Sequence, residues 1–455
     1  MKRPDTALSI FLIVLILMMY SCKKESDVIK HPIDLSQKVA AYPSDFEQPW
    51  IGVVLSLIKH TSGYSPPVSS RAIGYTFLVN YECLVYGMPA YQSLQNYLNI
   101  SPALPKPDSN TIYHWPAAAN AGLAEFLRLL FYNAGAADKN TIDSIETNFY
   151  HQFATEIDSN AMTASIAFGK AVADSIFEWS KSDGGYLANL NNYPAEYIPP
   201  TGPDKWIPTP APMNPSFNFK PALQPYWGNK RAFMMENISG VALLPPPVAF
   251  STDTASEMYK AAKDVYDVSL SLTTEQKAIA KFWSDELGSY SPPGHSLAIC
   301  GKIMAVKNAH LELATEALLK VGIAVNDAFI NCFKTKYTYN LLRPVTYIQQ
   351  HIDAGWNTYI GSPPFPEYAS CHSTQSGASA EILSNLFGEN TSYTDNTKDD
   401  VPLPARSFNT VHAFAQEAAI SRLYGGVHYR FSCNLGYNKG IIIGQNINTL
   451  LPVKK

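Results

Sequence analysis

The sequence predicts an all-α fold: a helical bundle crossed by an ordered, proline-rich loop region. Apolar residues recur with helical spacing from Arg71 to Leu98, and again over 117–134 and 140–177. Thr273 and Gln276 form a capping-box pattern at the start of a further helix. No segment shows strong strand alternation. Of the 455 residues, 46% are hydrophobic and 16% are charged, which suits a chain with a large core.

The proline-rich region separates two helical halves. Pro194 to Pro225 contains ten prolines, which remove backbone donors and make the segment irregular or extended. A disordered linker is the alternative, but the interleaved aromatic residues favour an ordered loop lying across the helices. The expected divisions are an N-terminal helical half over 46–193, the loop region over 194–250 and a second half over 251–455. Helices are expected in the second half at 273–287, 296–352, 373–387, 410–424 and 434–450, with a break at 291–294.

The first 22 residues resemble an export signal. Lys2 and Arg3 precede an apolar run from Ala7 to Tyr20, which is shorter than the roughly 20 residues of a bilayer span. A small residue precedes Cys22, as in a bacterial lipobox. We therefore expect Cys22 to be lipidated and the chain to be exported to the cell envelope, as a periplasmic or outer-membrane lipoprotein with a tether over 23–45. A plain signal peptide with a chance cysteine is the alternative.

Charge and cysteine content limit the partners and the redox state. The net charge is −4 and the isoelectric point is near 6.2, so no basic footprint indicates nucleic acid as a partner. An exported chain folds in an oxidising compartment. Five cysteines follow Cys22, so at least one is unpaired. Cys371 and Cys433 each lie beside a candidate site histidine, and the sequence leaves open whether they form a disulfide or remain buried thiols.

Lys336 and Arg343 are the first candidates for chemistry. They are separated by about two helical turns, so a continuous helix would place both on one face. Their neighbours are apolar and aromatic, and a half-buried pair of cations needs a counter-anion. Pro344 should end or bend this helix. Asp327 is expected either to orient one of the cations or to form a buried hydrogen bond between helices.

Two further segments carry donors and imidazoles. Ser370, Cys371 and His372 immediately precede a predicted helix, and the free N–H groups of a helix N-terminus form a natural seat for an anion. His372 is a candidate general acid or base beside that anion. Arg422 ends another predicted helix and supplies paired donors for an oxyanion. His428 follows after a glycine turn and is a candidate nucleophile or metal ligand.

These residues together form a three-part pattern. Lys-x6-Arg-Pro is followed by Ser-x-His and then by Ser-Arg-x5-His. The chain thereby resembles the family that unites type 2 phosphatidic acid phosphatases with vanadium-dependent haloperoxidases. The segments Pro293–His295, Pro199–Pro203 and Tyr226–Gly228 resemble the haloperoxidase-like branch, strongly over 195–445 and loosely from about 70. The resemblance implies an all-α bundle with the site at its core.

The resemblance also implies a role for each site residue. His428 would be the vanadium ligand, or the nucleophile if the enzyme is a phosphatase, and His372 would be the acid–base group. The cofactor would be vanadate in a haloperoxidase, with no group beyond bound phosphate in a phosphatase. The nonbridging oxygens of either ion would be bound by Lys336, Arg343, Ser370, Arg422 and the backbone N–H of Cys371.

Four positions need comment. Cys371 stands where the family usually has glycine, which strains the backbone only if a positive φ is required there. Ser432 stands where the family often has an aspartate that orients the last histidine, and a serine should do so more weakly. Phe333 replaces a common tryptophan. Phe365 resembles an aromatic of the halide pocket, although packing is the safer interpretation.

Three functions remain open at this point. The first is a haloperoxidase that binds vanadate and oxidises halide with hydrogen peroxide. The second is a phosphomonoesterase that forms a phosphohistidine at His428 in the same pocket. The third is a non-catalytic envelope lipoprotein, supported by Cys371 and Ser432. The first two act on small-molecule substrates, and the overall similarity favours the first.

Overall fold

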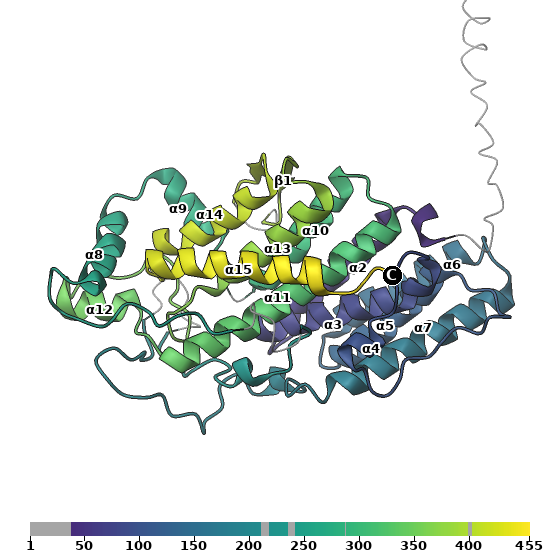
Figure 1. Cartoon of the computed structure of the whole chain (residues 1–455), viewed down its shortest axis with the longest axis horizontal. Coiled ribbons are helices and arrows are strands. Elements are labelled where there is room, and N and C mark those ends of the chain that lie inside the picture. Colours follow the sequence, from purple (N-terminus) through teal and green to yellow (C-terminus); the bar gives the residue numbers. More distant parts are fainter. Residues whose placement is uncertain (1–37, 211–217, 235–241, 287, 399–402) are drawn as a thin grey trace, which may run out of the picture. The chain divides into compact units, whose positions relative to one another are not determined.

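A computed structural model describes residues 38–210, 218–234, 242–286, 288–398 and 403–455. The prediction of an all-α fold is confirmed, because helices dominate these residues (Figure 1). Short 3-10 turns lie at Val39–Ala41, Ser44–Phe46, Val85–Gly87, Ala188–Leu190 and Trp227–Asn229. The helices before the proline-rich region are α2 (Glu47–His60), α3 (Pro66–Leu84), α4 (Gln95–Leu98), α5 (Trp115–Leu130), α6 (Ala136–Phe153) and α7 (Ser159–Ser180).

The second half of the chain is also mainly helical. Its helices are α8 (Glu257–Leu270), α9 (Thr274–Phe282), α10 (Ser291–Val306), α11 (Leu311–Tyr339), α12 (Pro344–His351), α13 (Cys371–Phe387), α14 (Val411–Tyr424) and α15 (Arg430–Leu450). Two short strands, β1 (Tyr393–Asp395) and β2 (Arg406–Phe408), pair antiparallel. The sequence analysis did not predict this hairpin, because three-residue strands are too short to show alternation.

Helix α11 organises the core that positions the site. It is 29 residues long, and its middle is buried on every side. It packs against α3 from the first half and against α10, α13 and α15 from the second. A helix surrounded in this way keeps no solvent-facing stripe along its buried stretch. The polar residues near its C-terminal end therefore lie in the interior of the protein.

A stripe of glycines lets α15 approach α13 closely. Gly436, Gly440 and Gly444 are four residues apart, so they lie on one face of α15. A Cβ at Gly436 would lie 2.8 Å from the carbonyl oxygen of Ser370, and a Cβ at Gly440 would collide with the carbonyl of Thr374. The stripe thus sets the position of the first turns of α13, which carry Ser370 at the N-cap.

The proline-rich region is ordered wherever the structure describes it. Trp206 and Trp227 are fully buried. The backbone N–H of Trp206 donates to the carbonyl of Asn340, 2.7 Å away. Asp327 accepts hydrogen bonds from the backbone N–H groups of Phe233 and Met234, at 2.9 and 2.8 Å. These contacts hold the region against the end of α11, on the side where the site lies.

Several helix boundaries differ from the prediction. The patterns over 71–98 and 140–177 are each divided, between α3 and α4 and between α6 and α7, and the segment 296–352 contains parts of α10, α11 and α12. The capping box of Thr273 and Gln276 is confirmed, but α9 ends at Phe282 instead of continuing to 287. The prolines after Ser291 start α10 rather than breaking a helix. Proline is favoured in the first turn of a helix, where its missing N–H is not needed. The predicted helices at 373–387, 410–424 and 434–450 begin within a few residues of α13, α14 and α15.

The N-terminal predictions fall mostly outside the described residues. The signal over 1–22, Cys22 and most of the tether over 23–45 lie there. The described residues begin at 38, and Val39 is already buried in the core. None of the helices that the structure describes combines the length and apolar character needed to cross a bilayer.

The glycine stripe yields a prediction about stability. We expect Gly440→Ala to lower the free energy of unfolding by about 1–3 kcal/mol, because the added methyl group overpacks the contact with Thr374. Gly52→Ala in α2 is the matched control, since a Cβ there meets nothing within 4 Å. That control should be neutral or stabilising by about 0.4–1 kcal/mol. Urea unfolding of both variants measures the difference, and equal effects would refute the close approach of α13 and α15.

Candidate active site

The three segments that carry the predicted site residues meet at one buried point. Lys336 lies in the last turn of α11, Arg343 at the N-cap of α12 and Arg422 in the last turn of α14. All three side chains are essentially inaccessible to solvent. Burial, and then the charges of Arg343 and Arg422, hold the pKa of Lys336 well below its usual value. Burial likewise lowers the pKa of each arginine to about 10.

Lys336 and Arg343 do not share one helix face, so that prediction was wrong. Helix α11 ends at Tyr339, and Asn340 adopts a left-handed conformation with φ of 51° that turns the chain. Asparagine tolerates this conformation better than most residues. Arg343 then caps α12, with Pro344 in its first turn. The two cations therefore converge through a turn rather than through helical periodicity.

Backbone carbonyls of the segment before α13 hold the cations in place. Lys336 Nζ donates to the carbonyls of Pro366 and Glu367, both at 2.8 Å. Arg343 Nε donates to the carbonyl of Phe365 at 3.0 Å. Arg422 Nη1 donates to the carbonyl of Trp283 at 2.8 Å. Asp327 contributes nothing here, because its carboxylate binds backbone N–H groups of the proline-rich region instead.

The segment Ser370–Cys371–His372 opens α13, as predicted. Ser370 is the N-cap and accepts hydrogen bonds from the N–H and the hydroxyl of Ser373, at 3.3 and 2.8 Å. Because the serine is the acceptor in both, its own hydroxyl proton remains available for an anion. Cys371 has no positive φ. A cysteine in the glycine position is therefore unstrained and can still present its N–H.

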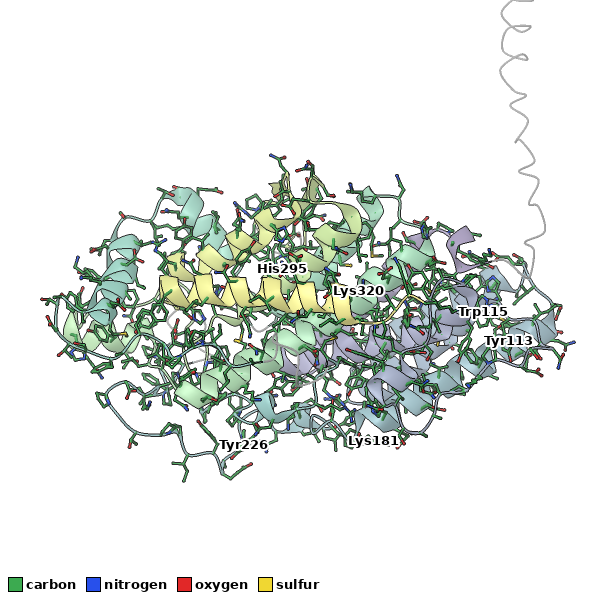
Figure 2. The ribbon with its side chains drawn as sticks, viewed as in Figure 1. Tyr113, Trp115, Lys181, Tyr226, His295 and Lys320 are labelled. Carbon is green, nitrogen blue, oxygen red and sulfur yellow. A yellow bond between two sulfur atoms is a disulfide. The ribbon has the colours of Figure 1, made fainter. Side chains whose placement is uncertain are left out.

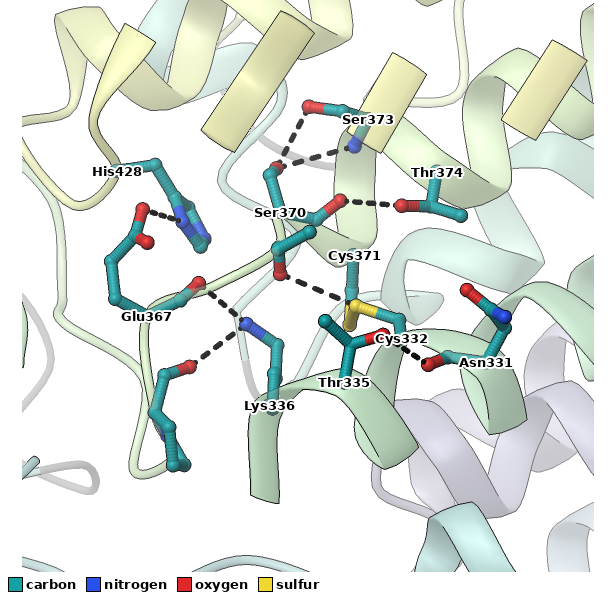
Figure 3. The surroundings of a disulfide bond; sticks show 12 residues. Asn331, Cys332, Thr335, Lys336, Glu367, Ser370, Cys371, Ser373, Thr374 and His428 are labelled. Atoms are coloured by element: carbon teal, nitrogen blue, oxygen red, sulfur yellow. Dashed lines mark hydrogen bonds and ion pairs between the residues drawn. A yellow bond between two sulfur atoms is a disulfide. The ribbon is translucent and has the colours of Figure 1, made fainter. Parts of the chain in front are cut away.

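Cys371 forms a disulfide with Cys332 of α11, and not with Cys433 (Figure 3). The Cα atoms of Cys332 and Cys371 are 5.8 Å apart. Cys433 is a buried free thiol. The sequence drew attention to Cys371 and Cys433 because each lies beside a site histidine. Cys332 gave no such signal, since it lies in the apolar run of α11.

His428 is held by hydrogen bonds on both ring nitrogens. Its Nδ1 lies 2.8 Å from Glu367 Oε1, and Arg343 Nη1 lies 3.2 Å from its Nε2. The Tyr429 N–H also donates to Glu367 Oε1, at 3.0 Å. Arginine can only donate, so Nε2 is the acceptor and Nδ1 carries the proton. Burial, and then Arg343 and Lys336, hold the pKa of His428 well below its usual value, so the ring is neutral.

Glu367 is a functional residue that the sequence analysis missed. It accepts the Nδ1 proton of His428, the role expected of the aspartate that the family often has where this chain has Ser432. Burial raises the pKa of Glu367 to about 7, and the nearby Lys336 and Arg343 oppose that rise. Two donors on one oxygen favour the carboxylate form. An acidic residue within the apolar run 363–369 was the available signal, because an isolated buried carboxylate needs partners.

A second network lies behind His372. Its Nε2 is 3.6 Å from Asp285 Oδ2. Asp285 is also paired with His295 at 3.1 Å and with Lys398 at 2.6 Å. The other ring nitrogen of His295 lies 2.8 Å from Asp395. An imidazole between two carboxylates is stabilised as a cation, and these carboxylates raise the pKa of His295 to about 9 against its burial.

The charge of Asp285 is therefore already balanced before His372 takes a proton. Lys398 and His295 hold the pKa of Asp285 well below its usual value despite burial. Burial, and then Arg422, lower the pKa of His372 to about 4. His372 is consequently neutral near pH 7. Sequence reasoning did not find Asp285 or Lys398, because neither lies close in sequence to a site residue.

Several buried polar atoms at this point lack hydrogen-bond partners. Among the described residues, Arg343 Nη2, Arg422 Nε and His372 Nε2 are buried without one. Leaving such groups unpaired costs about 1–3 kcal/mol each, and more when they are charged. They lie beside the neutral Nε2 of His428, the free hydroxyl proton of Ser370 and the start of α13. This donor set fits a small tetrahedral oxyanion.

Phe365 lies directly against the cations. Its ring centroid is 4.9 Å from Lys336 Nζ and 5.0 Å from Arg343 Cζ, within the range of cation–π attraction. The ring of Phe333 packs on it at 5.4 Å. Phe365 thus forms an apolar wall of the anion seat.

Fold and site together define an enzyme of the haloperoxidase and phosphatase superfamily. Residues 316–451 match the family model of the VCPO second helical-bundle domain. The chain resembles the crystal structure of the first bacterial vanadium-dependent iodoperoxidase, with a TM-score of 0.81 and 31% identity over 91% of this chain and 98% of that one. It therefore belongs to the vanadium-dependent haloperoxidase family.

Two more distant relatives share the fold. The vanadium chloroperoxidase of Curvularia inaequalis is 22% identical over 84% of this chain and 77% of its own. The holo-type structure of a bacterial vanadium-dependent chloroperoxidase gives a TM-score of 0.65 and 16% identity, over 86% of this chain and 93% of that one. The helical bundle is thus common to relatives whose sequences have diverged widely.

The network behind His372 yields a prediction about pH. We expect Lys398→Met to raise the pKa of His372. Without the lysine, Asp285 loses a cation at 2.6 Å and attracts a proton on His372 more strongly, against the opposing effect of Arg422 on His372. NMR titration of the histidine ring carbons, with His372 assigned by substitution, measures the change. Protonation of His372 should then begin at higher pH than in the parent protein.

Lys320→Met is the matched control for that titration. Lys320 (labelled with His295 in Figure 2) is also buried and pairs with a buried acid, Glu316, at 2.7 Å. It lies more than four helical turns before Lys336 on α11. The control should leave the titration of His372 unchanged. If Lys398→Met did the same, Asp285 would not couple the lysine to the imidazole.

Proposed function

We propose that the protein is a vanadium-dependent haloperoxidase that binds vanadate in this seat and oxidises a halide with hydrogen peroxide. The observation that carries the proposal is the set of unpaired donors around the neutral Nε2 of His428. Phosphate and vanadate share the tetrahedral shape and negative charge that such a set binds. Family membership supports the vanadate assignment.

The proton of His428 already lies on the nitrogen that vanadate would not use. His428 Nε2 offers an unshared electron pair, because Glu367 fixes the proton on Nδ1. Bound vanadate would supply a Lewis-acidic centre that activates hydrogen peroxide toward a halide. Its nonbridging oxygens would be bound by Lys336, Arg343, Ser370, Arg422 and the N–H of Cys371.

The side chains have distinct tasks in this proposal. Lys336, Arg343 and Arg422 neutralise the charge of the ion, and an anion beside them restores the pKa that burial has lowered. His372 is neutral, and its Nε2 lies 3.6 Å from the carboxylate of Asp285. It can therefore accept the proton that hydrogen peroxide loses on binding. Asp285 lies beside the imidazolium that this step creates.

Iodide is the halide that we would test first. The solved structure with 31% identity is described as an iodoperoxidase. In this chain, Phe365 covers Lys336 and Arg343 on one side of the seat. A large, polarisable and weakly hydrated anion suits a position between an aromatic wall and buried cations.

The two other functions have less support. A phosphatase would use the same anion contacts, but its leaving group must be protonated, and His372 is neutral near pH 7. The non-catalytic interpretation rested on Cys371 and Ser432. Cys371 is unstrained in the glycine position, and Glu367 orients His428 where Ser432 was expected to do so weakly.

Activity assays separate the three functions. With added vanadate and hydrogen peroxide, we expect oxidation of iodide, tested beside bromide, and no comparable hydrolysis of a phosphomonoester. His428→Ala should abolish the oxidation, because it removes the nitrogen that we propose as the vanadium ligand, and the other neutral imidazole at the seat, His372, faces Asp285. Glu367→Gln should reduce vanadate affinity or activity by about 10- to 100-fold, the usual cost of removing a partner that orients a ligand.

His151→Ala is the control for those assays. His151 is exposed on α6, outside the site, and the substitution should leave oxidation unchanged. Phosphomonoester hydrolysis without halide oxidation would instead identify a phosphatase. If the protein binds the anion but shows neither oxidation nor hydrolysis, the result would support the non-catalytic lipoprotein.

We also propose export and lipid anchoring through Cys22. Support comes from the basic start, the apolar run and the lipobox-like position of Cys22. Metabolic labelling with a radioactive fatty acid should mark the parent chain and not Cys22→Ala. Equal labelling of both would exclude Cys22 as the lipidated residue.

A further inference from the structure

We infer that the disulfide between Cys332 and Cys371 positions the oxyanion seat, by fixing Lys336 of α11 against the first turn of α13. The two cysteines are thus positioning residues that act through their neighbours and do not touch the anion through their side chains. The inference rests on the proposed anion site, but not on which reaction occurs there.

Each sulfur is attached beside an anion-binding group (Figure 3). Cys332 lies four residues before Lys336, so the two occupy the same face of α11 one turn apart. Cys371 is the first residue of α13, between Ser370 and His372, and its own N–H is one of the proposed donors. The covalent link therefore joins the element that carries the lysine to the element that carries the donors.

The anion-binding residues need such a link because their charges repel one another. Lys336, Arg343 and Arg422 are all buried and lie close enough to disfavour one another's charged forms. Glu367 is the carboxylate beside Lys336 and Arg343, and it is already engaged with His428. Without an anion, the positive N-terminal end of the α13 dipole also repels Lys336, which favours separation of α11 from the start of α13. A bond across that contact opposes the separation.

The side-chain hydrogen bonds of Lys336 do not reach α13 itself. Its Nζ donates to the carbonyls of Pro366 and Glu367, which precede the helix. The disulfide fixes the helix directly, at the residue where the family usually has glycine. We therefore expect the protein with the disulfide to be preorganised for the anion. The reduced protein should bind the anion more weakly, because part of the binding free energy is used to order the contact between α11 and α13.

Thermodynamic linkage between anion binding and disulfide formation gives the inference a second, independent readout. Reduction by a dithiol converts the protein disulfide to two thiols, while the dithiol loses two electrons and two protons and becomes a cyclic disulfide. If the closed disulfide favours anion binding by some factor, the anion must favour the closed disulfide by the same factor. A factor of about ten corresponds to a midpoint potential about 30 mV lower with the anion bound.

The experiment uses inorganic phosphate and the full chain, because thiol reductants also attack vanadate. Isothermal titration calorimetry compares the parent protein with Cys332→Ala/Cys371→Ala, which lacks the bond but keeps the N–H at 371. We expect about tenfold weaker phosphate binding in the double variant, within the usual range of such couplings. Dithiothreitol should weaken binding by the parent protein to the same extent and should not affect the double variant.

Cys83→Ala is the matched control for loss of a buried sulfur. Cys83 is a buried free thiol in α3, and its loss should lower stability without changing phosphate affinity. A purely structural role of the disulfide would lower the melting temperature and leave the phosphate affinity unchanged. That result would overturn the inference.

The remaining outcomes are also decisive. Redox titration of the parent protein should give a lower midpoint potential with phosphate, and an unchanged midpoint would refute the coupling even if the double variant failed to fold. A parent protein that binds no phosphate or vanadate at all would instead refute the proposed site. Failure of the inference and failure of the proposed function are therefore distinguishable.

Discussion

Unbalanced positive charge in the interior is the constraint on which the rest of the structure depends. Lys336, Arg343 and Arg422 are buried together, and Glu367 is the carboxylate among them. Burying like charges is expensive unless an opposite charge compensates them. A bound oxyanion would supply an opposite charge at this point, which makes the site selective for anions.

Three features of the scaffold keep these charges together. Backbone carbonyls of the segment before α13 hold Lys336 and Arg343. The glycines of α15 allow α13 to lie close enough for its N-terminus to face the cations. The disulfide then joins α11 to α13. Each feature acts on the backbone, which suits a site whose donors include N–H groups.

The sequence predicted the helical fold and the residues at the seat, because both depend on local spacing. Helical periodicity and the capping box of Thr273 are local, and the Lys336, Ser370 and Arg422 motifs are short. It did not predict features that depend on tertiary contacts. The turn at Asn340, the pairing of Cys371 with Cys332, and the approach of Asp285 to His372 each join segments whose proximity only the folded chain reveals.

The mistaken prediction for Lys336 and Arg343 shows this limit. Seven-residue spacing was sufficient to suggest a shared face, but the chain turns at Asn340 before Arg343 is reached. The two side chains still converge, through contacts with the segment at 365–367 that no periodicity encodes. Glu367 belongs to the same segment, and its partnership with His428 was invisible for the same reason.

The hydrogen bonds on His428 have a consequence for competition between metal and protons. Most histidine ligands lose metal on mild acidification, since a proton occupies the same electron pair below a pKa of about 6.5. Here Arg343 already donates to Nε2 and neighbouring cations repel an added proton. The imidazole thus stays neutral in weakly acidic surroundings, so a vanadate bound to it would meet little competition from protons.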